Sequence, residues 1–437
     1  MKTFFLKPYY FLLTAIVILA GSCELDTVNP NAPSDDQVLS TRDGIIALSV
    51  GVRQFYSTSG LDAILSTAVT GRELKGISTF TNVLELEAGS TALPTFNSNI
   101  LNLWGRMQRV MTMSEDILQN APNISSLSGG TLSGVTAHAQ LFKAIALGTL
   151  ATAFEQNNIQ TSKAGGTTFV PRQQVLQEAI RLLDNAIAVI TATPVSSEFN
   201  TLVTGPSFDL RNTLFAYNAR YNLMAGNYAK AIENADKVDL TRKSEFIYSS
   251  QSPNPVYNIV FILKNFGARD NFGLPAGLFE TGDRRYDFYL TTPNSSVNGD
   301  PLKTLKGFFD SQTAPIPVYL PDEMRLIKAE AILRNNGLLT DALVLINAVR
   351  TQTTGDPFNV YAALPPYTGA VTKDALLLEV YKQRSAELYL SGQKWEDSRR
   401  FGRPAPPAST AERNRNFYPY PDQERLNNPN IPGDPAI

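Results

Sequence analysis

Few residues of this 437-residue sequence have the types and spacing that covalent chemistry requires. It contains one histidine, His138, and one cysteine, Cys23, so any Ser-His-Asp or Cys-His arrangement would depend on His138 alone. The same scarcity argues against a zinc site, and the sequence has neither a Gly-x4-Gly-Lys-Ser/Thr phosphate loop nor a dinucleotide fingerprint. We therefore predict no catalytic residues, no metal site and no cofactor, and we expect His138 to be an ordinary histidine with hydrogen bonds.

Two nearby carboxylates, Asp283 and Asp287, are the best candidates for an acid and base pair in glycoside hydrolysis. They belong to the run Gly-Asp-Arg-Arg-Tyr-Asp at residues 282–287. Because arginine lies beside them, ion pairing explains the cluster more simply than catalysis does. We predict that the chain is not an enzyme.

The lone cysteine follows an apolar run from Tyr9 to Ala20 and the small residues Gly21 and Ser22. Basic residues before a run of about a dozen apolar residues are typical of a secretory signal peptide, whereas a membrane-spanning helix needs roughly 20. We predict that residues 1–22 are removed, that Cys23 is lipidated, and that residues 23–36 form a tether. The alternative is a small residue near an ordinary cleavage site. An acylated Cys23 would anchor the chain to a membrane without spanning it.

The charge balance is slightly acidic, with 38 lysines and arginines against 40 aspartates and glutamates. Nucleic-acid binding therefore has no electrostatic support. Charged residues make up 18% of the chain, below the roughly 25% of an average soluble protein. Such a composition is compatible with neutral polar ligands.

The elements that must position any site are mostly helical. Apolar residues spaced three and four apart predict helices. The predicted helices cover residues 41–57, 99–119, 133–154, 172–191, 208–225, 227–238, 321–335, 338–351 and 372–391. Residues 73–98 show no helical period and are predicted to be a loop that faces ligand. Seven prolines interrupt residues 239–320, which we predict to be a long insertion of loops and short strands.

Two of the predicted hairpins have the spacing of tetratricopeptide repeats. In the first, small residues Ala219 and Ala231 allow two helices to approach closely, and Gly226 permits the turn. The second has Gly337 at the turn, followed by Ala342 and Ile346. About three repeats are needed to bury a continuous core, so helices 99–119 with 133–154, and 172–191 with its successor, are expected to act as degenerate repeats. Chance recurrence of Gly and Ala is the alternative.

The C-terminal part resembles the signature of the SusD/RagB family, in the run QRSAELYLSGQKWEDSRRFG at residues 383–402. Gln383, Ser391 and Lys394 depart from that pattern, where the family has Glu, Glu and Arg. The positions that match as they stand are Arg384, Glu387, Leu388, Gly392, Asp397 and Arg400. Other motifs agree in order along the chain: Leu103-Trp104, residues 137–154, Asp283-Arg284-Arg285, residues 324–331 with 347–350, and the tail at 417–421 and 428–430.

The resemblance implies a mostly α fold with tetratricopeptide-like hairpins forming a right-handed scaffold, and residues 37–437 as one SusD-like domain. It also implies a lipoprotein on the extracellular face of the outer membrane that captures an oligosaccharide or another nutrient for a SusC-like TonB-dependent transporter. The signature residues Arg384, Glu387, Gly392, Asp397 and Arg400 are expected to clamp the last helix to the bundle through charge-assisted hydrogen bonds, a structural role.

Aromatic faces that stack on sugars, and polar side chains that bond hydroxyls, are sought in the two irregular segments. The candidates are Arg72, Phe80, Asn82, Phe96 and Asn97 in the first, and Tyr257, Phe266, Arg269 and Phe272 in the second. For each of them a core aromatic or a solvated polar residue is the alternative. A different class of function also stays open, in which the repeats bind a protein partner and no small ligand exists.

Overall fold

The computed structural model describes residues 38–162 and 164–437. The predicted signal peptide, the lipidation of Cys23 and the tether lie outside the described residues. Within these two ranges, no helix combines the length and the apolar character that crossing a membrane demands.

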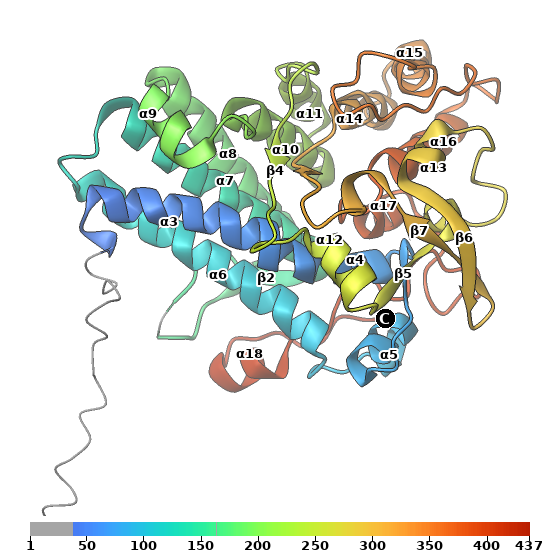
Figure 1. Ribbon diagram of the computed structural model, residues 1–437, viewed down its shortest axis with the longest axis horizontal. Coiled ribbons are helices and arrows are strands. Elements are labelled where there is room, and N and C mark those ends of the chain that lie inside the picture. The colour runs from blue at the N-terminus through green and yellow to red at the C-terminus, as the bar shows by residue number, and fades with distance from the viewer. Residues whose placement is uncertain (1–37, 163) are drawn as a thin grey trace, which may run out of the picture.

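The fold is mostly helical, as predicted, and its long helices stack side by side (Figure 1). In chain order, α6 packs on α7, α7 on α8, α8 on α10, α10 on α11, α11 on α14, and α14 on α15 and α16. The helices are α3 (Arg42–Phe55), α4 (Leu61–Thr70), α6 (Ser98–Asn120), α7 (Gly129–Ala153), α8 (Arg172–Ala192), α10 (Leu210–Ala225), α11 (Tyr228–Ala235), α14 (Pro321–Arg334), α15 (Leu339–Arg350), α16 (Lys373–Glu387) and α17 (Lys394–Arg400). Every helix predicted from periodicity is present, which confirms the tetratricopeptide-like scaffold.

The two predicted repeat hairpins differ at their turns. Gly226 ends α10 in the left-handed conformation, with φ +82°, and Ala219 and Ala231 are fully buried where α10 meets α11. In the second hairpin the left-handed residue is Asn336, with φ +56°, and not Gly337. Asparagine tolerates this conformation better than most residues. Gly337 follows it at a close approach, where an added Cβ would lie 2.9 Å from the Ile332 side chain.

The prediction of a loop over residues 73–98 is wrong in part. This segment contains strand β1 (Leu74–Gly76), helix α5 (Thr81–Ala88) and a 3-10 turn, η2 (Ser90–Ala92). Helix α5 is short and buries only Val83 and Leu86, so it has too few apolar positions to show a period.

The insertion forms short strands, as predicted, and adds several short helices. A four-stranded sheet has the order β1-β5-β7-β6 with antiparallel neighbours, so it joins the first irregular segment to the insertion. Along the whole described chain, the strands after β1 are β2 (Gln156–Asn158), β3 (Phe169–Pro171), β4 (Glu245–Phe246), β5 (Phe266–Arg269), β6 (Leu290–Val297), β7 (Asp300–Leu305) and β8 (Ile316–Pro317).

The remaining short helical elements, inside and outside the insertion, are η1 (Tyr56–Gly60), η3 (Ala121–Asn123), α9 (Ser197–Phe199), η4 (Asn200–Thr204), α12 (Pro255–Tyr257), η5 (Asn258–Ile262), η6 (Asp270–Gly273), α13 (Arg284–Tyr289), η7 (Gly307–Phe309) and α18 (Asp422–Asn427).

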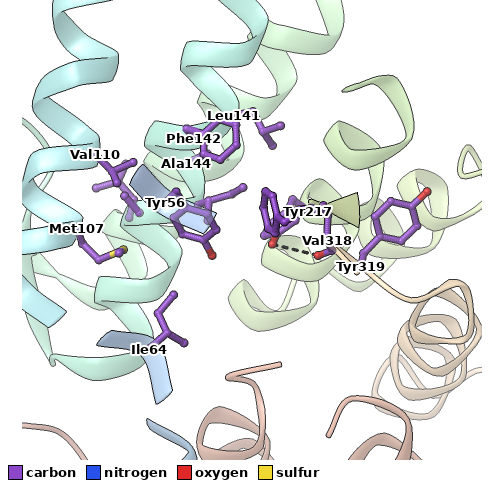
Figure 2. Packing of buried hydrophobic residues seen from close by; sticks show 14 of the residues in the cluster. Tyr56, Ile64, Met107, Val110, Leu141, Phe142, Ala144, Tyr217, Val318 and Tyr319 are labelled. Carbon is purple, nitrogen blue, oxygen red and sulfur yellow. Dashed lines mark hydrogen bonds between the residues drawn. The ribbon is translucent and has the colours of Figure 1, made fainter. Parts of the chain in front are cut away.

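The core continues from the helical stack to the insertion. Figure 2 shows Tyr217 of α10 beside Val318, whose carbonyl accepts a hydrogen bond from the Tyr217 hydroxyl at 3.3 Å. Tyr56 of η1 packs edge-on against Phe142 of α7, with ring centroids 5.6 Å apart. Aromatic contacts of this kind hold the loop-rich insertion against the helices.

Candidate functional site

The structure brings two of the predicted binding residues, Arg72 and Arg269, into one pocket of about 440 Å³. Arg72 follows α4, and Arg269 ends β5, nearly 200 residues later. Antiparallel pairing of β1 with β5 places the two segments side by side. The other described lining residues are Glu87, Asp270, Asn271, Gly273, Leu274, Pro275, Asp300, Pro301, Ser409, Thr410, Ala411 and Glu412.

Carboxylates hold the guanidinium groups in place. Arg269 donates to Glu87 Oε1 at 2.5 Å, to Asp300 Oδ2 at 2.8 Å and to the Leu74 carbonyl at 3.2 Å. Arg72 Nη1 donates to the same Glu87 oxygen at 3.1 Å. Hydrogen bonding from Lys75 lowers the pKa of Asp300 despite partial burial, and Arg269 lowers it further. The pocket therefore has a fixed set of hydrogen-bond donors and acceptors at its solvent-accessible opening.

The backbone beneath these side chains is unusual. Arg72, Asn271 and Phe272 have φ between +56° and +66°, a conformation that costs non-glycine residues free energy. Gly273, with φ +69°, lies so close to Arg72 that an added Cβ would be 1.9 Å from the Arg72 carbonyl oxygen. Glycine is therefore required at position 273, where η6 touches the segment that carries Arg72.

Three predicted binding residues are corrected, because the structure buries them. Phe266 and Phe272 are core side chains, 1% and 0% exposed. Asn97 is buried as the N-cap of α6, where its Oδ1 accepts from Asn99 N, and it donates to Glu85 and to the Asn82 carbonyl. Their side chains support the fold and do not face a ligand.

The remaining predicted residues lie outside the lining of this pocket. Phe80 and Phe96 are exposed, at 61% and 67%. Tyr257 is half-buried and stacks on Phe261, with ring centroids 5.1 Å apart. Asn82 is also half-buried, and its carbonyl accepts hydrogen bonds from two asparagine side chains.

The carboxylates of the pocket were not among the predicted binding residues. Asp300 had a usable signal, because Asn298-Gly299 between Val297 and Asp300 is a typical two-residue hairpin turn, and both turn residues have positive φ. Glu87 and the residues 409–412 had none, because only the packed fold brings them to Arg269.

The catalytic candidates are placed elsewhere. His138 is fully buried in α7 against Phe142 and Phe208, and neither ring nitrogen has a hydrogen-bond partner among the described residues, which corrects the expectation of ordinary hydrogen bonds. Asp283 accepts from Arg285 at 2.6 and 3.0 Å, so the ion-pair explanation is confirmed for it. Asp287 is exposed and takes part in no ion pair within the described ranges.

The signature residues form a buried network between α14, α16 and α17. Arg384 donates to both carboxylate oxygens of Asp397, at 2.8 and 3.1 Å, and Arg400 donates to Asp397 at 2.7 Å and to Glu330 of α14. Gly392 precedes α17 with φ +80°, and an added Cβ would be 2.8 Å from Ile64. The predicted clamp has the expected contacts, although Glu387 is not part of it.

Glu387 belongs to a second network centred on Arg285. This arginine is fully buried and donates to Glu387 Oε2 at 3.2 Å, to Asp283 and to the side chain and carbonyl of Gln383. Gln383, one of the departures from the family pattern, therefore accepts from Arg285 and donates to Glu379 at 2.8 Å. The network ties α13 to α16.

Lys394, another departure, is buried at the start of α17. Its Nζ donates to Ser385 Oγ at 2.9 Å, and burial lowers the pKa of Lys394 to about 8. Burial likewise raises the pKa of Glu73 to about 8. Glu73 directly follows Arg72 and accepts a hydrogen bond from Leu390 N at 2.9 Å. The signature run at 383–402 therefore contacts the segment that carries Arg72.

Comparisons with known proteins agree with this architecture. A family model described as the SusD family matches residues 310–432, the segment that contains the signature networks. No curated protein matches the chain.

Solved structures match over nearly the whole chain. A SusD superfamily protein from Bacteroides thetaiotaomicron has a TM-score of 0.71 and 16% identity, covering 91% of this chain and 100% of that one. A SusD-like carbohydrate binding protein from Bacteroides vulgatus has a TM-score of 0.69 and 15% identity, covering 90% and 97%. NanU of B. fragilis has a TM-score of 0.65 and 13% identity, covering 93% and 99%. At these identities the structures establish the fold, and the family resemblance in sequence is carried by the C-terminal segment, residues 310–432, which matches the SusD family model.

Proposed function

We propose that this protein captures a carbohydrate in the pocket shared by Arg72 and Arg269 and delivers it to a SusC-like TonB-dependent transporter. The observation that carries the proposal is the convergence of both predicted ligand-facing segments on one open pocket. One fold relative, from Bacteroides vulgatus, is described as carbohydrate binding.

The chemistry of the pocket suits sugar hydroxyls. Arginine offers several N–H donors in a planar fork, and ionised carboxylates accept hydrogen bonds. Arg72, Arg269, Glu87 and Asp300 bond to one another, so their orientations are set before a ligand arrives. Preorganised groups lose less conformational freedom on binding than mobile ones.

Helix α5 extends this surface beyond the pocket. Phe80, Leu84 and Glu87 are spaced four and three residues apart, so they follow one side of α5, and Phe80 and Leu84 are exposed at 61% and 50%. Phe80 lies about 10 Å along the helix axis from Glu87 at the helical rise. An oligosaccharide of a few units could therefore bond in the pocket and stack on Phe80.

Binding fits the pocket better than hydrolysis does. Glycoside hydrolysis needs one protonated carboxyl group as the acid. Asp300 accepts hydrogen bonds from Lys75 and Arg269, which lower its pKa and keep it ionised. We propose that the pocket holds its ligand without chemical change.

The proposed location is the extracellular face of the outer membrane, with a lipid on Cys23 as the anchor. A test of this part replaces Cys23 with alanine and follows the chain by cell fractionation and surface labelling. The proposal expects loss from the outer membrane and recovery in a soluble fraction. Pull-down of the native lipoprotein from solubilised outer membrane should also recover a large barrel transporter.

The binding site is tested on a glycan array followed by calorimetry with the best oligosaccharide. Phe80→Ala and Arg72→Ala should each weaken binding by about tenfold, and Leu338→Ala, which removes another exposed apolar side chain, should not. Unchanged affinity in both the Phe80 and the Arg72 variant would reject the site. Recovery of a transporter without any glycan binding would favour the protein-interaction function.

A further inference from the structure

A pocket of about 500 Å³ opens between the C-terminal ends of α14 and α17 and one side of α16. These three helices lie together in the right half of Figure 1. The lining residues of this α16 pocket fall between positions 334 and 403, a stretch that the structure describes without a gap. None of them lines the Arg72 pocket.

Helix α16 supplies a largely apolar wall. Its four lining residues are spaced three, one and three apart, so they share one face of the helix. They are Asp374, Leu377, Leu378 and Tyr381. Phe401, which follows α17, packs against Tyr381 with ring centroids 5.5 Å apart. The Tyr381 hydroxyl already donates to Glu412, and Asp374 is the single carboxylate of the lining, so the wall offers few acceptors for sugar hydroxyls.

Arg334, at the end of α14, presents an unused donor to this pocket. Its Nε donates to Glu330 Oε1 at 2.6 Å, and its Nη2 donates to the Arg400 carbonyl at 2.9 Å. Its Nη1 has no hydrogen-bond partner among the described residues. The guanidinium lies over the Phe401 ring, 5.0 Å from the centroid, and the side chain is 19% exposed. The group is therefore held in place and still reachable from solvent.

Arg403 presents a second donor. Its Nε and Nη2 both reach Glu412 Oε1, at 2.7 and 2.6 Å, and its Nη1 is left without a partner within the described chain. Its guanidinium lies 5.2 Å from the centroid of the Tyr381 ring, and its side chain is 23% exposed. Because Glu412 lines the Arg72 pocket, the Arg403–Glu412 ion pair separates the two sites.

The ion-pair network behind the α16 pocket has an excess of positive charge. Its carboxylates, Glu330, Glu396 and Asp397, are buried. Burial alone would raise the pKa of each, but the neighbouring arginines hold these pKa values below the usual ones, so all three are ionised. The arginines that pair with them in the described chain are Arg172, Arg334, Arg384, Arg399 and Arg400. Five guanidiniums therefore share three carboxylates, and Asp374 offsets only one of the two surplus charges.

We propose that the α16 pocket binds a small organic anion, a carboxylate joined to an apolar body. Nη1 of Arg334 and of Arg403 donate to the carboxylate, and Leu377 and Leu378 cover the apolar part. The volume lies within the range of small-molecule sites. A ligand of about a dozen heavy atoms in such a site binds with a dissociation constant on the order of 1 mM. The inference does not depend on the function proposed for the Arg72 pocket.

The test titrates 2-naphthoate into the mature protein and follows binding by ligand-observed NMR. The uncharged analogue 2-naphthalenemethanol keeps the rings without the charge, and inorganic phosphate keeps a charge without the rings. We expect 2-naphthoate to bind about fivefold more tightly than the alcohol, and equimolar phosphate not to displace it. Equal affinity for the alcohol, or displacement by phosphate, would overturn the proposal.

Variants then locate the bound anion. Arg334→Gln should weaken binding about threefold, and it should fold, because Glu330 keeps Arg400 as its partner. Asp374→Asn removes the carboxylate of the lining and should tighten binding about twofold, a gain that misfolding cannot produce. Arg181→Gln removes the same charge from an exposed ion pair on α8 and should leave the affinity unchanged.

Arg72→Ala separates this site from the proposed carbohydrate site. It should leave the affinity for 2-naphthoate unchanged, and 2-naphthoate should not displace an oligosaccharide from the wild-type protein. Loss of 2-naphthoate binding in Arg72→Ala would place the anion in the other pocket and overturn the proposal. Absence of binding to wild type, or equal affinity of wild type and Arg334→Gln, would overturn it as well.

Discussion

Arg400 of α17 donates from Nε and Nη2 to the two carboxylate oxygens of Glu330 in α14, at 2.7 and 3.0 Å, and the Glu330 side chain is fully buried. The same guanidinium reaches Asp397, which Arg384 also holds. Burial alone would raise the pKa of Glu330, but Arg400 and its arginine neighbours hold this pKa below its usual value. The signature therefore joins elements far apart in sequence through ionised, desolvated groups.

Replacing Arg400 with alanine should destabilise the protein strongly. Removal of one partner from a buried ion pair leaves the other charge without its counterpart, at a cost of about 3–5 kcal/mol. Thermal unfolding measures this as a lower melting temperature, while glycan affinity of the folded variant stays the same. Lys230→Ala removes an exposed pair with Glu233 and should leave the melting temperature unchanged. Equal stability of wild type and the Arg400 variant would contradict the structural role.

His138 should make the protein sensitive to acid. Burial, and to a smaller degree the charge of Arg53, lowers the pKa of His138 to about 3, whereas an unfolded chain has about 6.5. The unfolded state binds the extra proton between these values, so the free energy of unfolding falls as pH drops below 6.5, by up to about 1.4 kcal/mol per pH unit. His138→Met should lose part of this slope in urea unfolding at pH 7 and pH 5. An NMR titration of the single imidazole near pH 6.5 would contradict the prediction.

Glu73→Gln should reduce the loss of folding stability that occurs as pH rises. Burial raises the pKa of Glu73 to about 8 from about 4.3 in an unfolded chain, so the native state keeps a proton that the unfolded state loses. Stability therefore falls as pH rises from 4.3 to 8. Glutamine retains an acceptor for Leu390 N but has no charge, so the variant should show a flatter profile between pH 5 and 7.5. A wild-type slope that persists in this variant would assign it to another group.

Gly273→Ala should weaken both stability and glycan binding. The added methyl group would meet the Arg72 carbonyl at 1.9 Å, so the arm that carries Arg72 must move. We expect a loss of about 1–3 kcal/mol in unfolding free energy and a severalfold weaker affinity. Gly277 is a matched control, because it has a φ of +86° but no atom within 4 Å of an added Cβ. Gly277→Ala should cost about 1 kcal/mol through backbone strain and leave affinity intact.

Much of the helical scaffold could be predicted from the sequence. Periodic apolar residues specify a helix locally, and those of α8, such as Val175, Ala179 and Leu183, are fully buried as their spacing indicates. The signature run likewise indicated that Arg384, Asp397 and Arg400 act together. Helix α5 escaped prediction because its stability comes from contacts with other segments, including hydrogen bonds from the Asn414 side chain to the Leu86 and Glu87 carbonyls.

Local sequence thus determined which segments are helical, which residues form the signature, and that Arg72 and Arg269 were candidates for binding. Only the tertiary structure decided that these two arginines share a pocket, that Phe266 and Phe272 are core, and that Glu387 pairs with Arg285 and not with Arg384 or Arg400. The physical reason is the separation along the chain of the residues that interact. Helical periodicity depends on residues three and four apart, whereas burial and ion pairing depend on β1 meeting β5 and α13 meeting α16, contacts that span about 100 to 200 residues of chain.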